Sequence, residues 1–256
     1  MRYIDPQRFI QKRFADRTKP NWRVAVICFR DLKSSGILIN KLRAVPMKQV
    51  ILSGMDYPGD RPYVYEASIS DNPIGVISGC WWGGPQTAMV VEELACIGVE
   101  YIIGFGLAGS ISHDIPKCAH IVALRGLVTD GTSRAYTKAN SVSADDELLR
   151  MLLSIKHNLK NEIILTIIAT VDAIYQETDA AVQEWSNLGA QAINMETTPL
   201  YAASAACGIR SLWLGYISDR LLDNKWDDWS GLPDSLDDDS ADMTIALLES
   251  LVSKQR

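Results

Sequence analysis

The stretch Gln191-Ala-Ile-Asn-Met-Glu-Thr-Thr-Pro-Leu200 governs the interpretation of the fold: a short apolar run ends in Asn194-Met195-Glu196, and an apolar helical pattern follows. A second apolar run, residues 211–217, ends in Ser218-Asp219. We therefore expect two carboxylates at the carboxyl ends of two successive strands, which is where open α/β sheets hold their ligands. Glu196 beside Met195 suits a sugar, because a carboxylate accepts from two hydroxyls while a thioether packs on the ring. The alternative is that Glu196 caps the following helix, near an N-terminus that favours negative charge.

Strand-like and helix-like segments alternate along the rest of the chain. Apolar runs typical of buried strands occupy residues 23–28, 75–78, 101–103, 120–124 and 163–171. Helical spacing occurs at residues 87–96, 145–155, 179–188, 199–207 and 242–254. This alternation predicts an α/β fold, a three-layer α/β/α sandwich with a central mixed, largely buried sheet. We expect a polar N-terminal segment over residues 1–22 and a single domain over residues 23–256.

The composition excludes several classes of protein. Of 256 residues, 47% are hydrophobic and 22% charged, which fits one large domain with a sizeable core. A net charge of −6 without a basic run argues against nucleic acid as a partner. Five scattered cysteines without a CxxC motif indicate a reduced protein, and no apolar run reaches transmembrane length. We therefore expect a cytoplasmic location, no membrane partner and, because the three histidines are dispersed, no metal site.

Five motifs resemble those of a known family, and they occur in the same order. They are Trp82-Gly-Gly-Pro-Gln-Thr-Ala88 with the helix after it, Gly104-Phe-Gly-Leu-Ala-Gly-Ser110, Asp130-Gly-Thr-Ser133, Val171-Asp-Ala-Ile-Tyr175, and Asn194-Met-Glu-Thr197 with Ser218-Asp219. Together they resemble the nucleoside phosphorylase and nucleosidase superfamily, which holds hexameric purine nucleoside phosphorylases, uridine phosphorylases and methylthioadenosine nucleosidases. The resemblance runs from about residue 24 to residue 251 and implies a nucleoside phosphorylase-like fold.

The resemblance implies roles on the nucleoside side of a site. Glu196 and Met195 would clamp the sugar, and Asp219 would protonate or hydrogen-bond N7 of a purine. Uridine phosphorylases carry no aspartate there, so Asp219 favours a purine base; its alternative is a structural partner of Arg220 or a helix cap. The candidates for substrate binding are Met195, Asn194, Tyr175, Ile174, Ser218, Gly106 and Ala108. Trp226 and Trp229 follow in a polar loop, as a lid over the base or as ordinary packing residues.

The nucleophile side departs from the family pattern. Family phosphorylases hold phosphate with a Pro-Gly-Asp-type turn after the first strand, where this chain has Cys28-Phe-Arg-Asp-Leu-Lys33 and no flexible glycine. The family's arginine before the second glycine motif and the hydroxyl residue within it are Gly104 and Leu107 here. Since each charge-assisted hydrogen bond contributes roughly 1.5–3 kcal/mol, these losses weaken phosphate binding by orders of magnitude.

Three cations and one acid remain as candidates on that side. Arg61 falls at the place of the family's subunit-crossing phosphate arginine, although a surface turn is its alternative role. Arg30 and Lys33 are the other phosphate-binding candidates. If water is the nucleophile, as in the family's nucleosidases, Asp31 is the candidate base.

These observations predict phosphorolysis of a purine-type nucleoside to base and (deoxy)ribose 1-phosphate. Asp219, Glu196 and Asp31 are the catalytic candidates, with inorganic phosphate as co-substrate and no cofactor. A nucleosidase that uses water and a non-catalytic nucleoside-binding protein are the alternatives. The family resemblance implies a homo-oligomer, a dimer or a hexamer of dimers, whose sites are completed across subunit interfaces.

Overall fold

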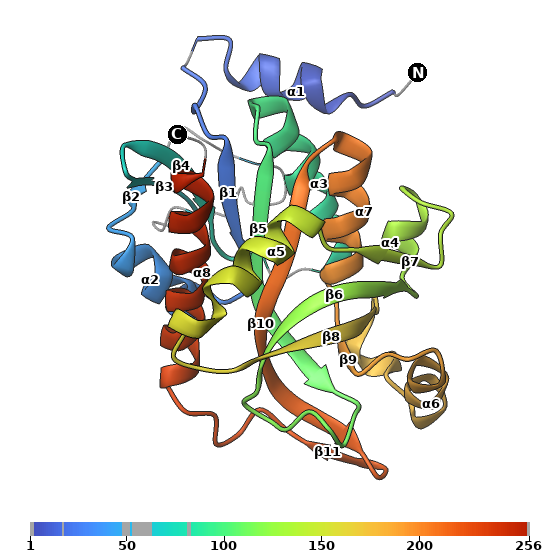
Figure 1. Ribbon diagram of the computed structural model, residues 1–256. Helices are drawn as coiled ribbons and strands as arrows, with labels where there is room; N and C mark the ends of the chain where they lie inside the picture. The colour runs from blue at the N-terminus through green and yellow to red at the C-terminus, as the bar shows by residue number, and fades with distance from the viewer. Residues whose placement is uncertain (1–2, 17, 48–51, 53–62, 81–82, 255–256) are drawn as a thin grey trace.

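A mixed sheet forms the centre of the computed structural model, which describes residues 3–16, 18–47, 52, 63–80 and 83–254 (Figure 1). The eleven strands follow the order β11-β10-β6-β8-β9-β5-β1-β4-β3-β2, and β7 pairs with β6. Their bounds are β1 Val24–Cys28, β2 Val45–Pro46, β3 Val64–Ile69, β4 Asn72–Ile77, β5 Tyr101–Ser110, β6 His120–Val128, β7 Ser141–Ser143, β8 Ile163–Thr170, β9 Ala192–Asn194, β10 Arg210–Leu222 and β11 Lys225–Asp227.

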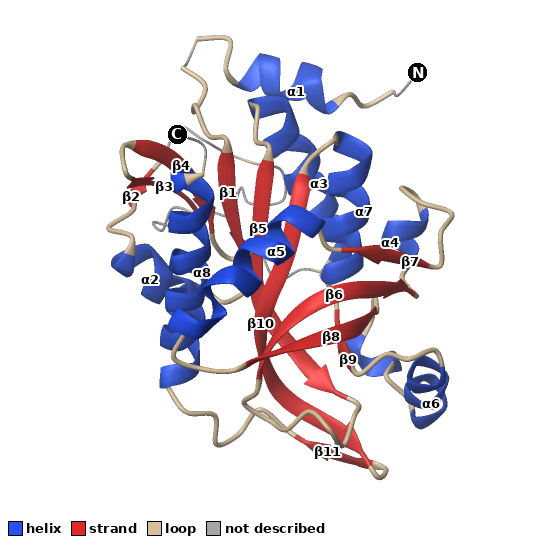
Figure 2. Ribbon diagram, viewed as in Figure 1, coloured by secondary structure: helices blue, strands red, loops and turns tan. Residues whose placement is uncertain are grey.

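Helices cover both faces of this sheet (Figure 2). Helices α2, α5 and α8 pack together on one face, and α1, α3, α4 and α7 pack together on the other. The helix bounds are α1 Pro6–Arg13, α2 Leu32–Lys41, α3 Gly84–Ile97, α4 Gly131–Arg134, α5 Asp146–Ile155, α6 Asp179–Asn187, α7 Thr197–Cys207 and α8 Ser235–Ser253, with 3₁₀ segments η1 Lys156–Asn158 and η2 Ile174–Gln176. The predicted three-layer sandwich with a central mixed sheet is therefore confirmed. No helix among the described residues is both long and apolar enough to cross a membrane.

Part of the sheet closes on itself, which the sequence pattern did not predict. Strand β10 pairs with β6 and also with β5, so β5, β10, β6, β8 and β9 form a closed ring. At the β5–β10 contact Gly215 pairs with Gly106, and a Cβ on Gly215 would lie 2.0 Å from the carbonyl oxygen of Gly106. The ring therefore requires glycine at position 215.

The strands that form the site are longer than the apolar runs that predict them. The second glycine motif is the carboxyl half of β5 rather than a loop, because its backbone pairs with β10 and β9. Strand β10 continues past Ile217 to Leu222, with a register shift between Ile217 and Asp219. The prediction that Asp219 lies at the end of a strand is therefore wrong: it lies inside β10, at this bulge. Bulges are typical places to re-aim a side chain beside an active site.

The N-terminal segment contributes apolar side chains to the core. Helix α1 packs on α3, and Ile10, Phe14 and Trp22 are buried in the main core cluster. Trp22 also donates its indole N–H to Glu66 on β3, at 2.8 Å. The division of the chain at residue 22 stays a prediction.

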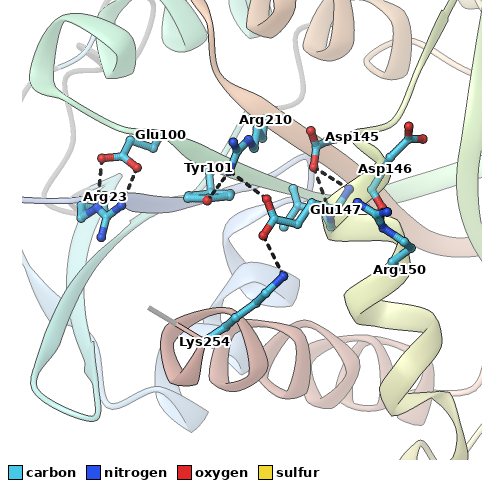
Figure 3. Close-up of polar contacts among 10 residues, drawn as sticks. Arg23, Glu100, Tyr101, Asp145, Asp146, Glu147, Arg150, Arg210 and Lys254 are labelled. Atoms are coloured by element: carbon cyan, nitrogen blue, oxygen red, sulfur yellow. Dashed lines mark hydrogen bonds and ion pairs between the residues drawn. The ribbon is translucent and has the colours of Figure 1, made fainter. Parts of the chain in front are cut away.

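Ion pairs gather at the amino ends of the central strands, opposite the strand ends discussed below (Figure 3). Arg23, just before β1, pairs with Glu100, just before β5, at 2.6 Å. Arg210 at the start of β10 pairs with Glu147 of α5 at 2.8 Å, and Lys254 after α8 pairs with the same carboxylate at 2.9 Å. The first pair links the starts of β1 and β5, and the other two link the start of β10 and the end of α8 to α5.

Candidate active site

A cleft of about 560 Å³ opens where several strands end. It is lined by residues 29–31 after β1, 107–109 of β5, 193–196 between β9 and α7, and 218–219 at the bulge of β10, together with Ile174, Glu177 and Trp229. Segments from distant parts of the sequence therefore meet at the carboxyl edge of the sheet, where α/β folds hold ligands.

Most of the candidate residues lie in this cleft. They are Asp219, Glu196, Asp31, Met195, Asn194, Ile174, Ser218, Ala108 and Arg30. Tyr175 is outside it and 95% exposed, because the 3₁₀ turn η2 points successive side chains in different directions. Lys33 is exposed on the first turn of α2, and Gly106 lies deeper in β5 against Phe29 and Trp213. Arg61 lies outside the described residues.

Strand β5 brings the two principal carboxyl groups to one place. Gly109 of β5 pairs with Ile193 of β9 on one side and with Asp219 of β10 on the other. Glu196 follows Ile193 by three residues, so both carboxyl groups flank the same point of β5. Glu196 and Asp219 are more than twenty residues apart in the sequence, and the strand pairing of the sheet brings them close together in space.

Glu196 is buried and does not cap α7. Its side chain makes no capping hydrogen bond; Oε2 instead accepts from the backbone N–H of Met195 at 3.2 Å. Asn194 serves the helix start, because its Oδ1 accepts from the N–H of Thr197 at 3.2 Å and its Nδ2 donates to the Thr197 hydroxyl at 2.8 Å. Burial raises the pKa of Glu196 to about 8. The protonated form of this carboxyl group is therefore favoured at neutral pH, and the group lines the cleft.

Asp219 is held by two donors. The Ser218 hydroxyl donates to Oδ1 at 2.6 Å, and the indole N–H of Trp226 on β11 donates to Oδ2 at 2.9 Å. In the described part of the chain Arg220 forms no ion pair with Asp219. The Trp226 ring meets Trp229 edge-on, with centroids 4.7 Å apart, and Trp229 lines the cleft. Trp226 thus orients Asp219, and Trp229 forms part of the wall of the cleft.

Glu177 is a residue that the sequence reasoning missed. It follows η2, three positions after Ile174, and its side chain lines the cleft that contains Asp219. Burial and the negative charge of Asp219 raise the pKa of Glu177 to about 7. The only sequence signal was its nearness to the motif at residues 171–175, which by itself indicates no role.

The cation of the cleft is already paired. Nη2 of Arg30 donates to both oxygens of Asp237, at 2.8 and 2.9 Å, to the Ser34 hydroxyl at 2.9 Å and to the Tyr216 hydroxyl at 3.1 Å. The neighbouring Asp31 accepts from the backbone N–H of Ser34 at 2.7 Å through Oδ1 and so caps α2. Arg30 and Asp31 therefore lie in the cleft, but each already has a structural partner.

Apolar side chains fill the place of the missing arginine. A Cβ on Gly104 would lie 2.8 Å from Leu200 and 2.9 Å from Phe29, so a longer side chain there would clash. Phe29 and Leu107 both line the cleft. This end of the site is therefore less polar than the family pattern implies.

Comparison with known proteins identifies the family of this chain. The model of the phosphorylase superfamily matches residues 47–253. The chain belongs to the phosphorylase superfamily. A uridine phosphorylase from Vibrio fischeri has a similar fold, with a TM-score of 0.68 and 21% sequence identity. The superposition covers 90% of this chain and 91% of the uridine phosphorylase chain.

Curated relatives are similar in sequence to parts of this chain. An uncharacterized protein of Acanthamoeba polyphaga mimivirus is 29% identical over 65% of each chain. A guanosine phosphorylase of Halorubrum lacusprofundi is 30% identical over 50% of this chain and 54% of its own length. A DeoD-type purine nucleoside phosphorylase of Clostridium novyi is 28% identical over 57% of this chain and 64% of its own. The chain thus spans between about half and two thirds of these relatives.

Proposed function

We propose that this chain cleaves the N-glycosidic bond of a purine-type nucleoside by phosphorolysis, releasing the base and (deoxy)ribose 1-phosphate. The observation that carries the proposal is the placement of Glu196 and Asp219 in one cleft, on segments that flank Gly109. Breaking this bond builds positive charge on the sugar and negative charge on the departing base. One group must hold the sugar hydroxyls, and another must serve the base.

Glu196 and Met195 are the proposed sugar clamp. Because Asn194 satisfies the start of α7, the Glu196 carboxyl group is available to a ligand. With a pKa near 8 it offers one O–H donor and further acceptor positions, which match the two kinds of hydrogen bond that a sugar hydroxyl makes. Met195 is partly buried at the same edge and supplies an apolar contact for the ring.

Asp219 is the proposed partner of purine N7. Ser218 and Trp226 each donate to one of its oxygens, so its carboxylate is fixed in orientation before a substrate arrives. Ile174 and Trp229 line the same cleft and would border the base. The relatives named above include a purine nucleoside phosphorylase and a guanosine phosphorylase, which supports a purine base.

Phosphate is the proposed nucleophile, held by Arg30. Arg61, outside the described residues, would join it from a neighbouring subunit of a homo-oligomer, either a dimer or a hexamer of dimers. The absence of a cofactor, the oligomeric state and the cytoplasmic location stay predictions.

Hydrolysis is the second candidate, and the pairing of Arg30 with Asp237 favours it. Arg30 is the one cation among the described lining residues, whereas the acids there are Asp31, Glu177, Glu196 and Asp219. Such a cleft attracts phosphate weakly. Water would then be the nucleophile, and Asp31, whose Oδ1 caps α2, would use Oδ2 to activate it.

Base release separates the candidates. The purified protein is incubated with adenosine, inosine, methylthioadenosine and uridine, each with and without phosphate, and the products are resolved by chromatography. Release of a purine only with phosphate, together with ribose 1-phosphate, is the expected result. Release with free ribose regardless of phosphate would establish hydrolysis. Binding of a nucleoside without release of any base would contradict both enzymes and indicate a nucleoside-binding protein.

A further inference from the structure

Glu177 lies where two cavities meet. The first is the cleft that contains Asp219, and the second is a cavity of about 550 Å³ on the other side of Glu177. Trp226, which donates to Asp219, lines the second cavity, and its ring partner Trp229 lines the first. Glu177 and the tryptophan pair therefore form the partition between the two cavities.

The second cavity reaches solvent. His113 and Asp223 form a pair at its rim, 3.4 Å apart, and their side chains are 69% and 73% exposed. Polar side chains make up much of its lining, so water can enter it from outside. A carboxyl group at the partition can thus face a ligand on one side and exchange protons with solvent on the other.

Charged groups on both sides set the environment of Glu177. In the cleft the titratable groups are Arg30, Asp31, Glu196 and Asp219. In the second cavity they are His113, Asp179, Asp223 and Lys225. Burial raises the pKa of Glu177, and of these charged groups Asp219 is the one whose negative charge raises it further. Arg30 is neutralised by Asp237, so it does not offset this effect.

Asp219 is placed to accept hydrogen bonds. Both of its oxygens already do so, one from the Ser218 hydroxyl and one from the Trp226 indole N–H, so the geometry offers no donor at this position. A leaving base nevertheless needs a proton, because its negative charge grows as the glycosidic bond breaks. The proton must therefore come from another group near the base.

We propose that Glu177 is the acid that protonates the departing base, and that the second cavity returns a proton to it from solvent. This inference rests on the proposed cleavage of an N-glycosidic bond. The Glu177 carboxyl O–H gives its proton to a ring nitrogen of the base while the C1′–N bond breaks and its electron pair passes to the base. Asp219 then accepts a hydrogen bond from the new N–H, and the Glu177 carboxylate takes up a proton through the second cavity.

Bonds and protons balance in this step whether phosphate or water is the nucleophile. Phosphate adds to C1′ through an oxygen and needs no base, whereas an attacking water loses its proton to Asp31. In both reactions Glu177 loses one proton to the base and regains one from solvent. Its pKa of about 7 leaves a large protonated fraction at neutral pH, which is the condition under which a general acid works best.

The test compares Glu177→Gln with Glu184→Gln, an exposed change on α6 outside both cavities. The substrates are the purine nucleoside that wild type cleaves and 4-nitrophenyl riboside, whose leaving group needs no proton. We expect Glu177→Gln to lower kcat on the nucleoside by roughly a hundredfold or more, to abolish the fall in rate above pH 7, and to spare the nitrophenyl substrate. Glu184→Gln should match wild type.

Three outcomes overturn the inference. One is an unchanged pH profile and rate in Glu177→Gln, and another is an equal loss on both substrates, which a structural role would produce. Should Glu177→Gln fail to fold, Glu177→Asp provides the test. This variant keeps a carboxyl group, so its rate must still fall above neutral pH. A rate that does not fall there is the third outcome. If wild type itself releases no base from any nucleoside, the proposed function is overturned as well.

Discussion

Arg30 and Asp237 form an ion pair in which Nη2 of the guanidinium lies 2.8 and 2.9 Å from the two carboxylate oxygens. The two side chains are only 11% and 16% exposed, and the Tyr216 hydroxyl donates to the same carboxylate at 3.0 Å. This pair joins the turn after β1 to the first turn of α8. It also decides how much positive charge the cleft can offer to a phosphate.

Asp237→Asn should strengthen the binding of phosphate. The change keeps an oxygen acceptor for Arg30 and Tyr216 but removes the negative charge, so Arg30 can attract an anion. Since a charge-assisted hydrogen bond contributes about 1.5–3 kcal/mol, we expect the KM for phosphate to fall roughly tenfold. The measurement is the rate of base release against phosphate concentration.

The control for this change is Asp238→Asn. Asp238 is the next residue on α8, and its half-exposed carboxylate pairs with Lys41 instead. It should leave the phosphate response unchanged. If Asp237→Asn behaves like this control, Arg30 does not hold the nucleophile.

Glu196→Gln should lower kcat/KM for the nucleoside strongly while the protein stays folded. The carboxyl group can lose its proton and accept from both sugar hydroxyls as positive charge develops on the sugar, whereas the amide of the same shape cannot. We expect a loss of roughly a hundredfold, from steady-state rates, with an unchanged circular dichroism spectrum. Near-normal activity would mean that Glu196 does not contact the sugar.

The stability of the protein should depend on pH through the two raised carboxyl groups. The pKa values of Glu196 and Glu177 are about 8 and about 7, whereas an unfolded glutamate titrates near about 4.3. The folded state therefore binds more protons, and the stabilisation present below about pH 4 is lost as the pH rises to about 8. Thermal unfolding should show Tm falling over this range.

Glu196→Gln should flatten that fall in Tm, because the amide cannot titrate. Glu100→Gln is the matched comparison, since the hydrogen bond from Arg23 lowers the pKa of Glu100 and its contribution has the opposite sign. An equal dependence of Tm on pH in wild type and Glu196→Gln would show that this carboxyl group is not titrating in the expected range.

Asp219→Asn should impair cleavage of purine nucleosides far more than cleavage of nucleosides with activated leaving groups. A purine needs a hydrogen-bond partner as its charge develops, and a nitrophenolate does not. Rates on inosine and 4-nitrophenyl riboside measure the difference. An equal loss on both substrates would make Asp219 a structural residue that serves Trp226 and Ser218.

The sequence predicted the layers of the fold well, because its apolar runs and helical patterns are separated by clear stops such as Gly98 and Gly208, both in left-handed conformation at helix ends. It did not predict the closed ring of strands. The ring closes because Gly215 of β10 packs directly against Gly106 of β5. A glycine in a sequence does not indicate which distant residue it will pack against.

The nucleoside side of the site was predicted more completely than the nucleophile side. Glu196 and Asp219 follow recognisable motifs, so their residue types indicated their place. Arg30 appeared as a free cation, because its partner Asp237 lies on α8, more than two hundred positions later in the sequence. Glu177 belongs to no motif, and the role proposed for it rests on two cavities that only the folded chain contains.

The double pairing of Gly109 has a consequence for how this architecture can diversify. The spacing of Glu196 and Asp219 is set by hydrogen bonds of β5, whereas the charge near Arg30 is set by a contact between the turn after β1 and the first turn of α8. Under the proposed function, recognition of the nucleoside and choice of the nucleophile therefore depend on different parts of the fold. A single exchange on α8 offers an engineering route from one co-substrate to another, with the nucleoside pocket left as it is.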